Sequence, residues 1–378
     1  MPGLRPDVDP DGLLEYSVVY TDRALNHMSK RFQQVMRDVS ATLKEVYGAR
    51  SAIIVPGSGS TGMESVARQF AGGKPCLIVR NCWFSYRWTQ ILEMSGIAPD
   101  PVVLKARRTG PGATAPFAPF APAPVDEVVA AIRQTKPTIV FAPHVETSAG
   151  MILPDGYLRT IADAVHAEGG MLALDCIASG AAWVDMRATG VDILLSAPQK
   201  GWSATPCAGL VMLSDHARER IDGTQSTSFS LDLKKWLSIM ETYESGAHAY
   251  HATLPTDGLV HLRDAMAELR AFGFAKAKEA QFELGRRVRA MFAERGISSV
   301  AAEGFGAPGV VVSYTDRSDW QNTSAFAAQG LQIAAGVPLA CDEGPDFKTF
   351  RVGLFGIDKW QNLDRTVETL RKALDAVR

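Results

Sequence analysis

The sequence has little cysteine, and the cysteines it has are scattered. Its 378 residues include five cysteines, an odd number, at positions 76, 82, 176, 207 and 341, with no Cys-x-x-Cys pair. Disulfide frameworks and cysteine zinc sites depend on even or closely spaced sets. We therefore expect reduced thiols, no disulfide framework and no metal site.

Strong charge and long apolar runs are also absent. The formal net charge is −2, which gives no reason to expect binding to nucleic acid or to an anionic membrane. No apolar run reaches the length of a membrane span. Residues 1–7 lack the basic and apolar regions of a signal peptide, so a cytoplasmic protein is expected. The composition, 46% hydrophobic and 21% charged, is that of a globular chain long enough for two domains.

Neither the dinucleotide pattern Gly-x-Gly-x-x-Gly nor a Walker loop is present. Instead, an apolar run at 51–55 leads into the glycine-rich turn PGSGSTG at 56–62, and a helical pattern follows. Such a turn places backbone N–H groups at the positive end of a helix dipole, where a phosphate binds. Many glycine-rich turns have only a steric purpose. The turn therefore indicates a phosphate site only if other residues support it.

Short apolar runs alternate with helical spacing over the first two thirds of the chain. This alternation predicts a parallel, doubly wound α/β sheet. From about residue 256 the pattern changes to long amphipathic helices around a strand at 310–313, which predicts a smaller α+β domain. We expect an N-terminal arm over 1–20, a large cofactor-binding domain over 21–255 and a small domain over 256–378. The predicted strands of the large domain are 51–55, 76–80, 101–104, 137–143, 171–175, 191–195 and 208–213.

Chemically distinctive residues come at the ends of these strands. They are the 58–60 turn, Trp83, Thr147, Asp175 and Lys200. The carboxyl ends of parallel strands meet at one edge of a sheet, so these five points should lie together. Each also has a plainer interpretation: Trp83 as core, Asp175 as a helix cap, and Lys200 as a solvated turn residue.

Taken together, the five points suit an aromatic aldehyde that carries a phosphate. The 58–60 turn would hold the phosphate, Trp83 would stack on the ring, and Asp175 would keep a ring nitrogen protonated. Lys200, once desolvated, could lose its proton and form a Schiff base with the aldehyde. This set of roles predicts pyridoxal 5′-phosphate (PLP) as the cofactor, with Lys200 and Asp175 as the catalytic residues.

The motifs resemble those of the class V aminotransferases, PLP enzymes of fold type I, and in particular the alanine–glyoxylate and serine–pyruvate branch. The resemblance implies a large domain with a mostly parallel seven-stranded sheet and helices on both faces, plus a small C-terminal α+β domain. The matching segments, which run in family order from about 57 to 356, are GSGSTGMES, NCWFSYRW, HVETSAG, DCIASG, SAPQKGW, AYHATLP and RVGLFG.

The resemblance also implies roles for single residues around the cofactor. Gln199 would assist the 58–60 turn with the phosphate, Thr147 would contact the ring hydroxyl, and Ile177 would pack opposite Trp83. The full implied cofactor set is Ser58, Gly59, Ser60, Trp83, Thr147, Asp175, Ile177, Gln199, Lys200, Tyr250 and Thr253.

Two further implications concern the partner subunit and the substrate. Tyr250 and Thr253 match positions that reach the phosphate of the neighbouring subunit, so the resemblance implies a homodimer with shared sites. Arg351 matches the arginine that clamps the substrate α-carboxylate, for which a bidentate guanidinium is well suited. Arg351 could also be a surface ion-pair residue.

The implied activity is a ping-pong transamination between a small amino acid, alanine or serine, and a 2-oxo acid, glyoxylate or pyruvate. One alternative is a 2-aminoethylphosphonate transaminase, with Arg23, Arg31 and Arg87 as conceivable phosphonate ligands. Another is a cysteine desulfurase, which would need Cys341 as a mobile nucleophile. In that family a histidine usually precedes the lysine, where this chain has Gln199. A non-catalytic binding or regulatory module is a third.

The chain departs from the family pattern in two places. Residues 13–30, LLEYSVVYTDRALNHMSK, replace the usual glycine- and proline-rich opening, and SATPCAG at 203–209 replaces the usual proline- and glycine-rich turn after the lysine. Both segments belong to the substrate side of the implied site. The motifs therefore predict the cofactor chemistry and leave the substrate open.

Overall fold

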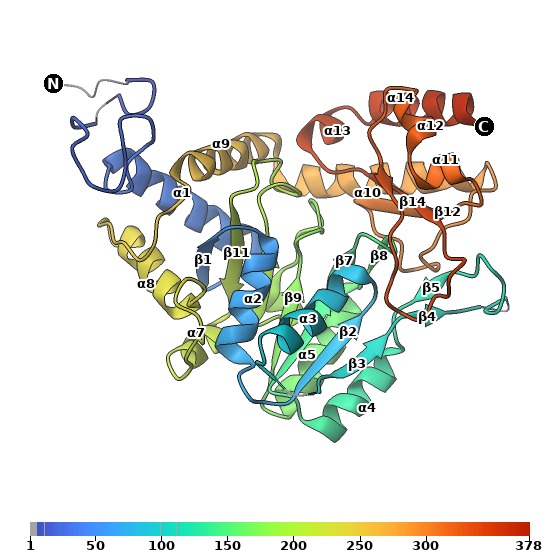
Figure 1. The fold of residues 1–378 in the computed structure, drawn as a ribbon, viewed down its shortest axis with the longest axis horizontal. Helices are drawn as coiled ribbons and strands as arrows, with labels where there is room; N and C mark the ends of the chain where they lie inside the picture. The colour runs from blue at the N-terminus through green and yellow to red at the C-terminus, as the bar shows by residue number, and fades with distance from the viewer. Residues whose placement is uncertain (1–5, 11, 99, 111) are drawn as a thin grey trace.

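The computed structural model describes residues 6–10, 12–98, 100–110 and 112–378. It contains a seven-stranded sheet with surrounding helices and a smaller three-stranded sheet formed near the C-terminus (Figure 1). Of the predicted arm, residues 1–5 and 11 lie outside the described part of the chain. Among the described residues, no helix has both the length and the apolar content needed to cross a bilayer.

The large sheet confirms the predicted mostly parallel, seven-stranded architecture. The strand order is β1-β11-β10-β9-β6-β2-β3, and only β11 runs antiparallel to its neighbours β1 and β10. In Figure 1, β1 and β11 lie side by side although they are far apart in the sequence. The strands are β1 Ser51–Pro56, β2 Cys76–Arg80, β3 Val102–Lys105, β6 Ile139–Pro143, β9 Met171–Asp175, β10 Ile193–Ser196 and β11 Ala208–Leu213.

Helices cover both faces of this sheet. The residues of β2, β6, β9, β10 and β11 are buried at every position, and side chains of a strand alternate between its two faces, so both faces must be covered. The helices of this part are α1 Lys30–Tyr47, α2 Gly59–Phe70, α3 Trp83–Met94, α4 Val125–Thr135, α5 Asp155–Ala167, α6 Met186–Thr189, α7 Asp215–Ile221 and α8 Leu233–Glu244.

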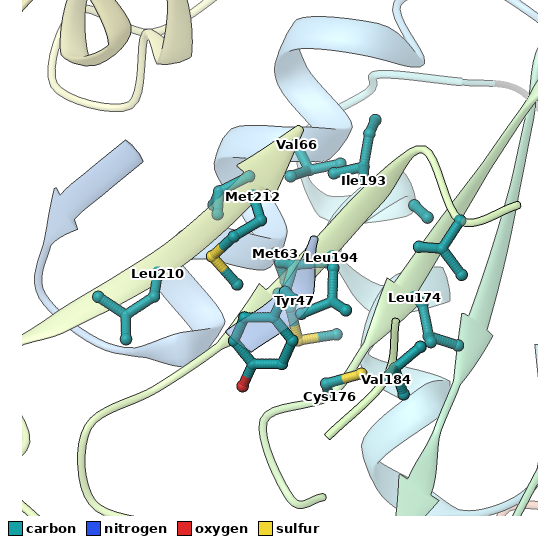
Figure 2. Close-up of a cluster of buried hydrophobic side chains, with 14 of the residues drawn as sticks. Tyr47, Met63, Val66, Leu174, Cys176, Val184, Ile193, Leu194, Leu210 and Met212 are labelled. Carbon is teal, nitrogen blue, oxygen red and sulfur yellow. The ribbon is translucent and has the colours of Figure 1, made fainter. Parts of the chain in front are cut away.

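At the centre of the sheet, core side chains of the strands pack against the first two helices. Figure 2 shows Leu194 of β10 and Leu210 and Met212 of β11 beside Tyr47 of α1 and Met63 of α2, all nearly inaccessible to solvent. Burial of large apolar side chains is the main favourable term in folding. The strand that leads to Lys200 is therefore held firmly from both sides.

The C-terminal part forms an antiparallel sheet in the order β12-β14-β13, with helices packed around it. Its first helix, α9, also contacts α1, so this part is packed onto the large sheet's helices. The boundary at residue 256 stays a prediction. The elements are α9 Thr256–Phe272, α10 Phe274–Ala293, β12 Val310–Tyr314, α11 Ser318–Gln321, α12 Ser324–Ala327, β13 Ala334–Ala335, β14 Thr349–Gly353, α13 Ile357–Gln361 and α14 Leu363–Val377. Two small hairpins, β4 Arg107–Arg108 with β5 Phe120–Ala121 and β7 Val145–Glu146 with β8 Met151–Ile152, complete the fold.

Candidate active site

The turn before α2 is built as an anion cradle. Gly57 has φ +126°, a backbone conformation that residues with a side chain rarely adopt. Ser58 caps the helix, since its Oγ accepts from Thr61 N at 3.4 Å while Ser58 N donates to Thr61 Oγ1 at 3.1 Å. A Cβ at Gly59 would lie 2.6 Å from the Ile177 side chain, so a larger residue there would force Ile177 to shift. The N-terminus of α2 thus meets the carboxyl edge of the sheet with Ile177 packed on Gly59.

Arg87 of α3 adds a positive charge to the cradle. Its Nη1 donates to Ser60 Oγ at 2.7 Å, and its Cζ lies 5.3 Å from the centroid of the Phe84 ring. The Arg87 charge also acts on Asp175, whose pKa it lowers. Sequence reasoning considered Arg87 only as a phosphonate ligand. Its position within the NCWFSYRW motif was the available signal.

Asp175 is the last residue of β9 and is 8% exposed. Among the described residues, its carboxylate accepts one hydrogen bond, from Ile177 N at 2.9 Å. Burial raises the pKa of Asp175 to about 6, against the opposing effects of the Ile177 N–H, Arg87 and Lys200. The carboxyl group therefore has acceptor capacity left for a cationic ligand atom.

Lys200 lies in the turn after β10, where its side chain is largely covered. Burial lowers the pKa of Lys200, the positive charge of Arg351 lowers it further, and Asp175 opposes both effects. The ammonium nitrogen lies 5.3 Å from the centroid of the Phe355 ring. An amine in these surroundings loses its proton more easily than a solvated lysine does.

Arg351 comes from β14 in the C-terminal part, and its charge still acts on the lysine. Its Nε donates to the Ala335 carbonyl at 2.7 Å. Burial lowers the pKa of Arg351, and the Cys82 thiol opposes this effect. The fold thus brings a half-buried guanidinium from the small sheet to the edge of the large one.

The stacking position has two candidates. Trp83 is the first residue of α3, is 37% exposed, and its ring centroid lies 5.6 Å from that of Tyr86. Phe84, the next residue, is half-buried and lies under Arg87, which is bonded to the cradle. The predicted role of Trp83 stays a prediction, and Phe84 is a candidate that sequence reasoning missed.

The other predicted cofactor residues have different surroundings. Thr147 is buried between β7 and β8, and Ile177 packs on Gly59. Gln199 is exposed beside Lys200.

Tyr250 and Thr253 pair with each other. The Tyr250 hydroxyl lies 3.1 Å from Thr253 Oγ1, and the Tyr250 ring is 52% exposed and tilted against His27. In the described chain, the Tyr250 and Thr253 hydroxyls bond to each other, and neither belongs to the cradle. Their role at a neighbouring subunit therefore stays a prediction.

Sequence reasoning also missed a buried carboxyl group, Glu146. The Cys82 thiol donates to its Oε2. Burial raises the pKa of Glu146 to about 8, and the nearby charge of Asp175 raises it too. HVETSAG contains Glu146 and Thr147, but nothing in the letters marks the glutamate as buried and protonated.

Comparison with known proteins agrees with this fold. The family model described as "Aminotransferase class-V" matches residues 115–337. Alanine–glyoxylate aminotransferase of Oryctolagus cuniculus is 26% identical over 362 residues, covering 93% of this chain and 86% of the relative. 2-Aminoethylphosphonate–pyruvate transaminase 2 of Paraburkholderia xenovorans is 29% identical over 338 residues, covering 86% and 84%.

Solved structures share the fold. Alanine–glyoxylate aminotransferase from Nostoc sp. superposes with a TM-score of 0.76 at 21% identity, covering 93% of this chain and 88% of the other. Pyridoxamine–pyruvate aminotransferase from Mesorhizobium loti also gives 0.76, at 17% identity, covering 96% and 87%. The class V fold family is PLP-dependent. The chain belongs to the aminotransferase class-V family.

Proposed function

We propose that this protein binds PLP and transfers an amino group between a small amino acid, alanine or serine, and a 2-oxo acid, glyoxylate or pyruvate. The observation that carries the proposal is the meeting of Lys200, Asp175 and Arg351. They come from separate parts of the chain, and the charges of Asp175 and Arg351 both act on the Lys200 amine. Lys200 supplies an amine, Asp175 a hydrogen-bond acceptor and Arg351 a clamp for the α-carboxylate. These are the three groups that the reaction requires.

The residues at the sheet edge fit PLP. A phosphate would lie on the α2 N-terminus and be helped by Ser60 and Arg87, which are already bonded to each other. The unfilled acceptor capacity of Asp175 suits a protonated pyridine nitrogen. Either Phe84 or Trp83 would stack on the ring, with Ile177 on its other face. When bound, PLP supplies an electron sink for the pair of electrons left by a lost Cα proton.

The chain's own residues do the positioning and the proton transfer. Arg351 binds the α-carboxylate and so fixes the direction of the Cα–H bond. With PLP bound, Lys200, whose pKa is lowered by burial and by Arg351, would hold the cofactor aldehyde and, as a free amine, would accept the Cα proton and return it. Asp175 would face the ring nitrogen and keep it protonated.

The rival activities fit the surroundings less well. Cys341 is 5% exposed, its Sγ lies 3.4 Å from the Arg80 carbonyl, and burial raises its pKa to about 12, so it is a poor mobile nucleophile for a desulfurase. Among the three conceivable phosphonate ligands, Arg87 is bonded to the cradle and Arg31 Nη1 donates to the Val8 carbonyl. The similarity to 2-aminoethylphosphonate transaminases keeps that substrate in the test below.

We also propose a cytoplasmic homodimer. The N-terminal segment lies against the segment that carries Tyr250, because Tyr20 OH donates to the Leu254 carbonyl at 3.0 Å. Exposed apolar side chains lie on these segments, namely Leu13, Tyr16, Val18 and Tyr250, and exposed Phe229 contacts His251 next to Tyr250. A second subunit would cover them and bring Tyr250 and Thr253 to its own cradle.

The test is a stopped-flow donor screen with PLP-loaded protein. We expect alanine or serine to convert the visible absorption band of the lysine-bound cofactor fastest, and 2-aminoethylphosphonate to be slow. Lys200→Ala should lose that band and lower turnover by about 10⁴-fold or more. Lys372→Ala, an exposed lysine of α14 paired with Glu368, is the matched control and should behave as wild type. Full transaminase activity in Lys200→Ala would overturn the proposal, and preference for the phosphonate would replace the substrate.

A further inference from the structure

Two histidines and an aspartate meet at the edge of the sheet opposite to Lys200. Asp192 directly precedes β10, whereas Lys200 follows the other end of that strand. His166 lies in the last turn of α5 and His216 in the first turn of α7. The three side chains can each offer a ligand atom, and these atoms all lie within 4.8 Å of one another.

Both imidazoles point at the same carboxylate. His166 Nε2 lies 2.7 Å from Asp192 Oδ2, and His216 Nδ1 lies 3.0 Å from Asp192 Oδ1. The Asp192 side chain is 3% exposed, while the histidines are 34% and 39% exposed. The cluster is therefore buried on its carboxylate side and open to solvent on its imidazole side.

We propose that His166, Asp192 and His216 form a binding site for a divalent transition metal, with Zn²⁺ as the best match. Two imidazole nitrogens and one carboxylate oxygen are a three-ligand zinc set that leaves a fourth position for water. Mg²⁺ and Ca²⁺ prefer oxygen ligands alone, so this donor set disfavours them. The inference is independent of the transaminase proposal, because the cluster lies at the amino ends of the strands. It differs from the expectation of no metal site, which rested on cysteine spacing alone.

Closing the cluster onto a metal ion requires a modest adjustment. In a tetrahedral site, two zinc–ligand bonds of about 2.1 Å place their ligand atoms about 3.4 Å apart. The largest separation in the cluster is at most 4.8 Å, so closing it takes a shift of at most roughly 1.4 Å. The two imidazole rings are about one third exposed and have room to rotate by this amount.

Neighbours outside the cluster already hold the Asp192 carboxylate in place. Leu172 N donates to Asp192 Oδ2 at 2.8 Å, and Ser214 Oγ donates to Oδ1 at 3.3 Å. Such outer contacts orient a ligating carboxylate. A bound metal would join the end of α5 to the start of α7, so its effect would be on stability rather than on chemistry. The simpler alternative is a link made by hydrogen bonds alone, and the two can be separated by experiment.

The experiment uses untagged protein from which metal has been removed with EDTA. Binding of Zn²⁺ alone is measured by isothermal titration calorimetry. A separate titration with Co²⁺ reports the coordination geometry by absorbance. We expect one Zn²⁺ per chain, tetrahedral Co²⁺ bands, no Mg²⁺ binding and a melting temperature that rises with Zn²⁺. His216→Gln should weaken Zn²⁺ binding by roughly tenfold or more. The control is His261→Gln. His261 is an exposed histidine of α9 whose Nδ1 is hydrogen-bonded to Thr205, and the variant should bind Zn²⁺ as wild type does.

Two outcomes would overturn the site. In the first, the wild-type protein binds no Zn²⁺ and its melting temperature does not change when Zn²⁺ is added. The other is His216→Gln protein that binds Zn²⁺ as tightly as wild type. Melting in EDTA checks that His216→Gln is folded, and His166→Gln provides a second variant that must show the same loss.

Discussion

The two edges of the large sheet each carry a buried aspartate, and the two have opposite surroundings. The Asp175 carboxylate, at the carboxyl edge, accepts a single hydrogen bond from the described residues, that of Ile177 N. The Asp192 carboxylate, at the amino edge, accepts from His166, His216, Leu172 N and Ser214 Oγ. The two residues are similarly hidden, at 8% and 2% exposed. Burial alone therefore does not separate a functional carboxylate from a structural one.

The number of partners does separate them. A buried carboxylate with unfilled acceptors costs stability, so it persists where a ligand supplies the missing partner. A carboxylate with four donors has its acceptors filled by the protein and can hold elements together. Asp175 is thus expected to matter for turnover and Asp192 for stability.

The largest expected effect is that of Asp175→Asn on turnover. An amide cannot hold the cofactor ring nitrogen protonated, so kcat/KM should fall by roughly 10³-fold, about 4 kcal/mol. The melting temperature without PLP should not fall, because the native state no longer contains a partly unsatisfied carboxylate. Steady-state kinetics and thermal melting of the same preparation measure both. Equal kcat/KM for variant and wild type would remove Asp175 from the reaction.

Asp192→Asn should show the reverse pattern. Removing the carboxylate leaves two histidines without their shared partner, which should lower the free energy of unfolding by about 3 kcal/mol. Urea unfolding in EDTA measures this loss without any contribution from metal. The kcat/KM per folded molecule should stay at the wild-type value. A variant that is as stable as wild type but inactive would contradict the assignment of the two edges.

Glu146 is a third buried carboxyl group, in addition to Asp175 and Asp192. Its pKa is raised to about 8, mainly by burial, so the native state keeps a proton that the unfolded state loses near pH 4.5. The wild-type free energy of unfolding should therefore decrease as pH rises from about 4.5 to about 8. Glu146→Gln lacks this titration. The variant should gain on wild type across that window, by on the order of 4 kcal/mol at its upper end. Melting curves over a pH series measure the difference, and a difference that is constant with pH would refute the burial of a protonated Glu146.

Much of the fold followed from the sequence, because its signals are local. Buried strands of four to six apolar residues and the helices between them predicted the elements along the chain and a mostly parallel sheet, and five strand ends predicted where the site lies. Lys200 and Asp175 were proposed this way, because Asp175 ends β9 and Lys200 lies in the turn after β10.

The missed residues depend on contacts between distant segments. Cys82 and Glu146 are 64 residues apart, and His166 and His216 lie 26 and 24 residues from Asp192. No local pattern marks such pairs. The choice between Trp83 and Phe84 depends on the rotation of α3, since consecutive helix residues point about 100° apart. The proposed role of Tyr250 and Thr253 involves a second subunit, so the structure of a single chain does not test it.

Locating the covalent cofactor site tests the role of Lys200 most directly. Protein loaded with PLP is reduced with borohydride, digested and mapped by mass spectrometry. We expect one phosphopyridoxyl group per chain, on the peptide that contains Lys200. A group fixed on a different lysine, or none at all after loading, would contradict it.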